Sequence, residues 1–257
     1  MDTVTERYFD FTGKVVLVTG GATGIGRAVS LAFARQGATV VIGDIGARSS
    51  ETVNLIEKEG GRGLFVPTDV TVAREVSRLV STTVDTFGDL HIAFNNAGVF
   101  VPPVPLAQQT EEDFDKAIAV DLKGVFLSLK YEIAHMASAG GGSIINTASI
   151  AGLIGDPDMA PYVAAKHGVI GLTKAAAVDY AKAGVRVNAL APGLTKTAMT
   201  QAWLDDPVKR DVVMAGPQLG RAAEPEEIVG MVLYLASSAA SFTTGGVFVV
   251  DGGQTAH

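Results

Sequence analysis

Short apolar runs alternate with helix-like segments along the chain, and this alternation constrains the fold more than any other feature. The runs have the continuous Val, Ile, Leu and Ala content of strands that are buried on both faces. Strands that alternate with helices favour parallel pairing, so the pattern predicts a single α/β domain over residues 1–257, with a doubly wound sheet and helices on both faces. The expected strands, about seven, are 14–19, 38–43, 63–67, 90–94, 143–146, 185–190 and 247–250, and the expected helices are 24–36, 49–59, 72–87, 111–137, 161–183 and 225–237.

Composition excludes several classes of function. The 257 residues are 47% hydrophobic, enough for one sizeable core, and neither a linker nor a repeat divides them. A net charge of −7 without a basic run argues against a nucleic-acid partner. The lack of Cys excludes disulfides and thiolate catalysis, and the four His residues lack ligand spacing, so no metal is expected. No apolar run reaches about 18 residues and residues 1–10 are polar, so we expect a cytoplasmic protein without a membrane partner.

A glycine-rich turn connects the first expected strand to the first expected helix, and its residues 19–26 read TGGATGIG. Glycines permit a tight turn and a close approach of the backbone to a pyrophosphate, while free N–H groups at a helix N-terminus favour an anion. The spacing differs from Gly-x-Gly-x-x-Gly, and a tight turn without a ligand is the alternative. The position between a strand and a helix favours a bound dinucleotide.

An acidic residue, Asp44, follows the second expected strand, 18 residues after Gly26. A carboxylate there can accept hydrogen bonds from the ribose diol of an adenosine and repels a 2′-phosphate, which predicts NAD rather than NADP. Arg48 is the nearest cation along the chain. A solvated loop acid is the alternative, and the neighbouring glycine turn argues against it.

A strand end and the helix after it supply an acid/base pair. The run 143–146 leads to Ser149, and Pro161 suits the first turn of the following helix. Tyr162 and Lys166 are four residues apart, so they share one helix face. An ammonium favours a phenolate, so we expect Lys166 to lower the pKa of Tyr162 from about 10 toward working pH. A helix-surface pair without a function is the alternative.

Together these segments make the chain resemble the short-chain dehydrogenase/reductase family over nearly its whole length. Further segments carry the resemblance: the pair 69–70, the run Asn-Asn-Ala-Gly at 95–98, the run 192–197 and the ending Asp-Gly-Gly at 251–253. The resemblance implies a Rossmann-like fold that binds NAD. It assigns cofactor contacts to Gly20, Thr23, Gly24, Ile25, Gly26, Asp44, Ile45, Asp69, Val70, Asn96, Ala97, Gly98, Tyr162, Lys166, Pro192, Gly193, Thr195 and Thr197.

The resemblance also implies reversible hydride transfer between the nicotinamide and a small-molecule secondary alcohol or ketone. Tyr162 would be the acid/base, Lys166 would favour its phenolate and hold the nicotinamide ribose, and Ser149 would donate a hydrogen bond to the substrate oxygen. The family commonly has Asn in the middle of the long helix where this chain has Asp121. We therefore count Asp121 with the catalytic group, as a structural and proton-relay position whose carboxylate can pair with Lys166.

Apolar residues near these positions predict an apolar pocket for a cyclic, aryl or medium-length substrate. Val99 and Phe100 follow the Asn-Asn-Ala-Gly run, and Leu153 lies between Ser149 and Tyr162. The resemblance implies that 194–220 forms a substrate lid within the domain, as a long segment with apolar residues often does. An ordinary helical excursion packed on the body is the alternative.

The sequence also leads to an expectation about assembly and leaves two alternative functions open. The helix from residue 161 has more apolar and small positions than one buried stripe needs, and the resemblance implies a homotetramer. An NADPH-dependent 3-oxoacyl-thioester reductase stays open, although Asp44 and the acidic balance argue against it. A dinucleotide-sensing protein without catalysis also stays open, although Ser149, Tyr162 and Lys166 argue against it.

Overall fold

The computed structural model describes residues 9–46 and 48–256, and a single parallel sheet forms their centre. The sheet has seven strands in the order β3-β2-β1-β4-β5-β6-β7, which confirms the predicted doubly wound fold. Most of the polar N-terminal stretch, 1–8, lies outside the described residues. The strands are β1 Val15–Thr19, β2 Thr39–Asp44, β3 Arg62–Pro67, β4 Ile92–Asn95, β5 Gly142–Thr147, β6 Val185–Pro192 and β7 Val247–Val250.

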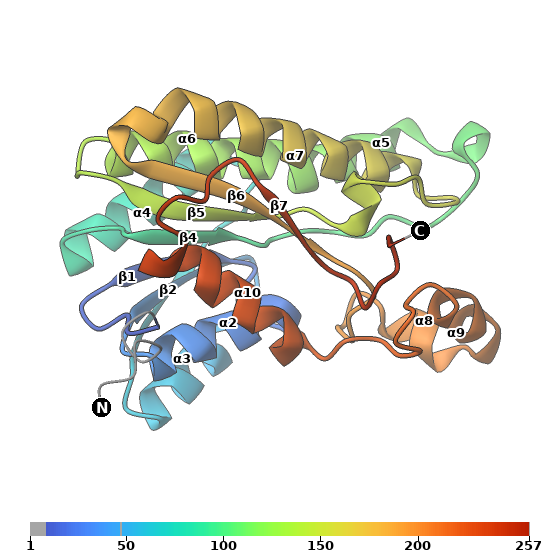
Figure 1. The fold of residues 1–257 in the computed structure, drawn as a ribbon, viewed down its shortest axis with the longest axis horizontal. Helices are drawn as coiled ribbons and strands as arrows, with labels where there is room; N and C mark the ends of the chain where they lie inside the picture. The colour runs from blue at the N-terminus through green and yellow to red at the C-terminus, as the bar shows by residue number, and fades with distance from the viewer. Residues whose placement is uncertain (1–8, 47, 257) are drawn as a thin grey trace.

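Helices cover both faces of the sheet in two layers (Figure 1). One layer holds α4, α5, α6 and α7, and the other holds α2, α3 and α10. Across the described ranges, none of the helices combines the length and the hydrophobicity needed to cross a bilayer. The helices of the two layers are α2 Gly24–Arg35, α3 Ser49–Lys58, α4 Ala73–Phe87, α5 Glu111–Ala117, α6 Gly124–Met136, α7 Ala160–Tyr180 and α10 Pro225–Ala236.

The two layers explain why the strand sequences are continuously apolar. In β1, Val15 and Leu17 pack into a core with residues of α4, α6 and α7. Val16 and Val18 point the other way and pack with residues of α2, α3 and α10. Because a strand alternates its side chains between the two faces, and both faces are covered, the four residues from Val15 to Val18 are all apolar and buried.

The order of the strands creates a crevice at the carboxyl ends of the central strands β1 and β4. The chain moves outward from β1 through β2 to β3, and then from β4 through β5 and β6 to β7. β1 and β4 are therefore neighbours, with Thr19 paired to Asn95, while the segments that follow them diverge. In open α/β sheets this reversal point, at the carboxyl ends of the strands, is where ligands bind.

One predicted helix, 111–137, is interrupted by a different kind of helix. Between α5 and α6 the chain forms a π-helical segment, Ile118–Lys123, which contains Asp121. The extra residue of a π turn changes which side chains face inward, and Asp121 is fully buried. The expectation of one regular helix over 111–137 was therefore wrong around Asp121, the residue that replaces the Asn common in the family.

The segment 194–220 is a partly helical excursion from the sheet. It contains α8 Gln201–Asp205 and α9 Pro207–Met214, which lie at one edge of the molecule (Figure 1). Backbone hydrogen bonds close its base, from Lys196 N to Ala223 O at 2.8 Å and from Ala223 N to Leu194 O at 2.9 Å. These hydrogen bonds attach the start of the segment to Ala223. The role of the segment as a lid stays a prediction.

A buried carboxyl group, Glu132 on α6, ties helices and strands together behind the crevice. Asn95 Nδ2 donates to Glu132 Oε2 at 2.9 Å and to Asn146 Oδ1 at 3.0 Å, and Asn146 Nδ2 donates to Thr173 Oγ1 at 3.0 Å. Glu132 Oε1 and Asn95 Oδ1 are buried acceptors without a donor. Burial raises the pKa of Glu132 to about 7, opposed only by the hydrogen bond from Asn95. A proton on Glu132 would supply the missing donor.

We predict that stability falls as this proton is lost. The folded protein binds the proton more tightly than the unfolded chain, so its contribution is fully present below the ordinary pKa of 4.5 and is lost as the pH rises through about 7. The free energy of unfolding should fall by about 3 kcal/mol across this interval because of Glu132 alone.

Glu132→Gln is the matched variant because an amide can donate to Asn95 Oδ1 and still accept from Asn95 Nδ2. Urea unfolding of both proteins, from about pH 5 to about pH 8, should show the decline in the wild type and a flatter profile in the variant. Parallel profiles would show that Glu132 is not protonated in the folded protein.

Candidate active site

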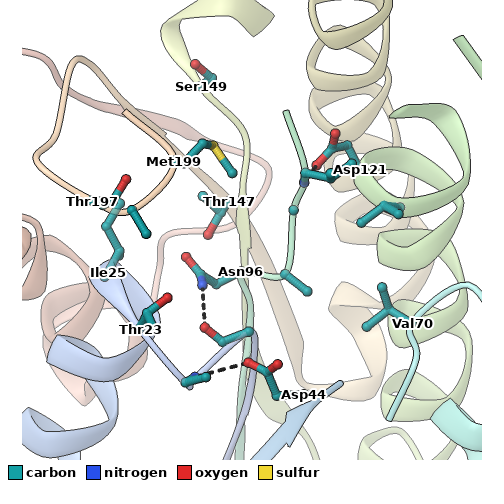
Figure 2. A pocket seen from close by; sticks show the side chains of 18 of the residues that line it. Thr23, Ile25, Asp44, Val70, Asn96, Asp121, Thr147, Ser149, Thr197 and Met199 are labelled. Carbon is teal, nitrogen blue, oxygen red and sulfur yellow. Dashed lines mark hydrogen bonds between the residues drawn. The ribbon is translucent and has the colours of Figure 1, made fainter. Parts of the chain in front are cut away.

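A cavity of about 520 Å³ fills the crevice at the carboxyl ends of the strands. Figure 2 shows Ser149 and Met199 at one end and Thr23 and Asp44 at the other. The cavity brings together nearly all of the predicted site residues. They are Gly20, Thr23, Gly24, Ile25, Asp44, Ile45, Asp69, Val70, Asn96, Ala97, Gly98, Asp121, Ser149, Tyr162, Lys166, Pro192, Gly193, Thr195 and Thr197.

Gly26 is the one predicted cofactor residue that does not line the cavity. A Cβ atom at this position would lie 2.1 Å from the carbonyl oxygen of Gly20, an impossible contact. Gly26 therefore lets α2 pack directly against the end of β1, which is a structural role. The direct cofactor contact of Gly26 stays a prediction.

The glycine turn has the geometry of an anion cradle. Gly20 and Gly24 have φ values of +69° and +54°, which other residues rarely adopt. A Cβ atom at Gly20 would lie 2.8 Å from Ala97 Cα, so only glycine allows this approach. Thr23, the N-cap of α2, makes no side-chain capping hydrogen bond, which leaves first-turn N–H groups available. These residues fit the diphosphate of a dinucleotide.

Two polar side chains fix the turn to the neighbouring strands (Figure 2). Asn96 Nδ2 donates to Gly20 O at 3.2 Å, and Asp44 Oδ2 accepts from Ala22 N at 3.1 Å. Asp44 Oδ1 also accepts from Gly46 N at 3.0 Å. The carboxylate thus sits at the far end of the cavity with both oxygens oriented by backbone groups, and each oxygen keeps a lone pair for a ribose hydroxyl.

The predicted catalytic residues meet at the opposite end. Lys166 Nζ lies 5.3 Å from the centre of the Tyr162 ring and donates to Thr147 O at 3.0 Å. Ser149 Oγ accepts from Ala151 N at 3.2 Å, which leaves its hydroxyl hydrogen to donate to the Tyr162 oxygen or to a ligand oxygen. The i, i+4 spacing on α7 and the strand end at β5 position these groups as predicted.

Asp121 joins this group through Lys166. Its Oδ1 lies 3.8 Å from Lys166 Nζ and accepts from Val99 N at 3.0 Å. Its Oδ2 is buried without a hydrogen-bond partner. Burial raises the pKa of Asp121, while Lys166 and the Val99 N–H lower it. Lys166 is itself only 3% exposed, so the two opposite charges compensate each other in a poorly solvated place.

The pKa of Tyr162 is raised above its ordinary value of 10, contrary to the prediction from sequence. Burial is the largest cause, and Lys166 opposes it as predicted. Asp121 and, more weakly, Asp156 raise the pKa further, while the hydrogen bond with Ser149 lowers it. The sequence showed the cation but gave no measure of the desolvation or of the carboxylate beside that cation.

Several cavity residues were not predicted. Thr68 and Thr147 stand at or just after the ends of β3 and β5, so the rule that ligands meet strand ends could have found them. Lys116 on α5 also lines the cavity, and no sequence signal marked it. Thr147 has the further feature that its Oγ1 is buried without a partner. Among the described residues, no group of three His, Asp or Glu side chains has the arrangement of a metal site.

Known proteins resemble this chain over nearly its full length. A family model described as Enoyl-(Acyl carrier protein) reductase matches residues 20–255. Cyclohexanol dehydrogenase of Acinetobacter sp. (strain SE19) is 42% identical over 246 residues, 95% of this chain and 96% of the relative. A 2,5-dichloro-2,5-cyclohexadiene-1,4-diol dehydrogenase of Sphingobium indicum is 41% identical over 249 residues, 96% of this chain and 99% of the relative. A 3-oxoacyl-[acyl-carrier-protein] reductase of Thermotoga maritima is 39% identical over 243 residues, 94% of this chain and 97% of the relative.

Solved structures share the fold as well. Levodione reductase superposes with a TM-score of 0.91 at 36% identity, covering 96% of this chain and 99% of that one. A 2-deoxy-D-gluconate 3-dehydrogenase-type protein from Agrobacterium tumefaciens, which contains bound NADP, superposes with a TM-score of 0.91 at 32% identity. It covers 98% of this chain and 100% of its own.

The charges around Lys166 predict the effect of Asp121→Asn. The amide can still accept from Val99 N, but it removes a negative charge that raises the pKa of Tyr162. Tyr162 should therefore ionise at a lower pH in the variant, because the phenolate becomes the only anionic partner of Lys166 at this site.

Ultraviolet difference absorbance of the phenolate measures this ionisation without any substrate, and the same titration in a Tyr162→Phe background isolates the signal of Tyr162. Asp156→Asn is the matched control and should give a smaller shift in the same direction, because Asp156 contributes least to the pKa. An unchanged or higher midpoint in Asp121→Asn would mean that Asp121 is not charged beside Lys166.

Proposed function

Because the chain belongs to the short-chain dehydrogenase/reductase family, we propose that it transfers a hydride reversibly between NAD(H) and a cyclic secondary alcohol or the matching ketone. It is a nicotinamide-dependent oxidoreductase that acts on CH–OH groups. One observation carries the proposal: Tyr162, which contacts both Ser149 and Lys166, lines the same cavity as the glycine turn and Asp44. Figure 2 shows Ser149 and Asp44 at opposite ends of that cavity.

The cyclic substrate is supported by the relatives and by the surface near Tyr162. Two relatives are named for alcohols on a six-carbon ring, cyclohexanol and a dichlorocyclohexadienediol. In this chain, Leu153, Ile154 and Met199 are each about 40% exposed on the segments beside the catalytic end. An apolar, compact substrate would cover part of this surface.

Tyr162 moves the proton in the proposed mechanism. It removes the hydroxyl proton during oxidation and returns a proton to the carbonyl oxygen during reduction. Ser149 donates a hydrogen bond to that oxygen and stabilises its developing charge. Lys166 stabilises the phenolate, and its bond to Thr147 O holds the ammonium in place. A nicotinamide held beside Tyr162 and Lys166 would supply or accept the hydride.

The choice of NAD over NADP is part of the proposal and rests on Asp44. Its carboxylate lies at the end of the cavity opposite Ser149, where a ribose would be held by the strand end of β2. A 2′-phosphate would place two negative groups together there. A structural relative contains bound NADP, so the fold alone does not favour NAD, and Asp44 is the basis for the choice.

Homotetramer assembly and a cytoplasmic location also stay proposals. Large apolar side chains are exposed on α5, α6 and the region around β7, where the resemblance implies subunit contacts. They are Phe114, Phe126, Phe242 and Val249.

The proposed function predicts fast consumption of NADH, with little consumption of NADPH, when cyclohexanone is the substrate. The preference for NADH in kcat/KM should be at least about tenfold, equivalent to about 1.4 kcal/mol. Asp44→Asn should reduce this preference, because the amide can keep one backbone hydrogen bond but no longer repels a 2′-phosphate.

A panel of cyclic, aryl and aliphatic ketones and a 3-oxoacyl thioester, each with both nucleotides, makes the test decisive. Asp85→Asn, an exposed change on α4, is the control. A wild type that prefers NADPH and the thioester would replace this proposal with the biosynthetic reductase, which the relative from Thermotoga maritima represents. NADH binding without turnover of any substrate would favour the sensing protein.

Tyr162→Phe should reduce kcat by at least about a thousandfold and leave the Kd for NADH within about threefold. The ring keeps its contacts with Phe100 and Lys166, while the proton donor is lost. Single-turnover kinetics and a fluorescence titration with NADH measure the two quantities separately. Near-normal turnover in this variant would remove Tyr162 from the mechanism.

A further inference from the structure

Three aromatic rings from three separate segments meet beside the catalytic end of the cavity. The Phe100 ring centre lies 5.0 Å from that of Tyr162, with 47° between the planes. It also lies 4.8 Å from the Trp203 ring, which it meets edge to face at 83°. Both distances fall within the range of favourable aromatic contacts. Phe100 therefore joins the catalytic tyrosine to α8 of the segment 194–220.

The loop that carries Phe100 is fixed on both sides of this residue. Val99 donates its N–H to the buried Asp121 at 3.0 Å, and Val101 is only 3% exposed. Phe100 itself is half-buried, so part of its ring stays accessible between two anchored neighbours. A ring held in this way can present a surface to a ligand with little loss of conformational entropy on binding.

Trp203 is held in a comparable way from the other side. Thr200 Oγ1 donates to Thr195 O at 2.6 Å, and Trp203 N donates to Thr200 O at 3.0 Å, which begins α8. Val99, Thr200 and Tyr162 all line the cavity. Phe100 follows the first of these in sequence, and Trp203 lies about one helical turn after the second. Neither ring is itself among the residues that line the cavity, but the pair adjoins its catalytic end because Phe100 packs on Tyr162 and Trp203 packs on Phe100.

We propose that Phe100 and Trp203 form an aromatic surface that binds the hydrocarbon ring of the substrate and makes the enzyme selective for compact cyclic alcohols and ketones. This inference rests on the proposed function and adds the residues that recognise the carbon skeleton. Tyr162 and Ser149 hold the reacting oxygen, so the carbons attached to it must extend toward neighbouring surfaces. A flat or puckered six-carbon ring covers an aromatic face well, whereas a flexible linear chain loses more rotational freedom when it does so.

The test compares two alcohols of equal carbon number, cyclohexanol and 2-hexanol, with saturating NAD. The measured quantity is the ratio of their kcat/KM values, since general damage to catalysis cancels in this ratio. We expect Phe100→Ala and Trp203→Ala each to reduce the preference for cyclohexanol at least about tenfold, mainly through KM. Trp203→Phe keeps an aromatic edge and should stay within about threefold of the wild type.

Leu55→Ala is the control, because that side chain is exposed on α3 and does not line the cavity, and its ratio should be unchanged. A wild-type ratio in both alanine variants would overturn the proposal. Circular dichroism would show whether either alanine variant fails to fold. In that case the two milder variants, Trp203→Phe and Phe100→Leu, are compared with the wild type. Phe100→Leu keeps most of the side-chain volume but removes the aromatic face. An unchanged ratio in Phe100→Leu would also contradict the proposal.

Fluorescence provides a readout that needs no turnover, because Trp203 is the only tryptophan in the chain. Cyclohexanone added to the NAD-saturated protein should change the emission with saturation, and 2-hexanone should do so only at higher concentration. Phe100→Ala should weaken the response to cyclohexanone. No response in the wild type would contradict the aromatic surface. Failure of the proposed function looks different: no alcohol would be oxidised with either nucleotide, while the fluorescence response to cyclohexanone could still be measured.

Discussion

The contact between the ends of β1 and β4 is the constraint on which the site depends. Thr19 Oγ1 accepts from the backbone N–H groups of Asn96 at 3.0 Å and Ala97 at 3.2 Å, so the two segments are joined where they begin to diverge. Gly20 fits against Ala97 only because it has no Cβ. The crevice thus has a fixed floor, and the chain on either side can diverge to form a cavity without losing the continuity of the sheet.

At the catalytic end, the cost of burying charged groups is offset by the attraction between opposite charges. Lys166 is a nearly buried cation, and it lies between the Tyr162 ring and the Asp121 carboxylate. Burial makes each charge costly alone, so the protonation of each group depends on its neighbours. An Asn in place of Asp121 would leave the phenolate as the only anion for Lys166. The Asp in this chain therefore gives Lys166 an anionic partner that Asn would not provide.

The aromatic contacts link this end of the cavity to the segment 194–220. Tyr162 is held by α7, Phe100 by a loop after β4, and Trp203 by the short helix α8 within that segment. Selectivity for the substrate can therefore vary through residues that never touch the reacting oxygen. This separation agrees with the range of names among the relatives, which share the fold and differ in the alcohol or thioester they are named for.

The sequence alone determined the sheet, the two helical layers and most of the cavity residues. Apolar runs and glycine positions are local signals, and strands that alternate with helices leave few possible topologies. Tertiary structure decided three further properties: the π-helical segment around Asp121, the raised pKa of Tyr162 and the contact of Phe100 with Trp203. Each depends on distances between residues far apart in the chain, or on how completely a group is removed from water. Periodicity identifies which face of an element is buried, but it carries no information about what lies against that face.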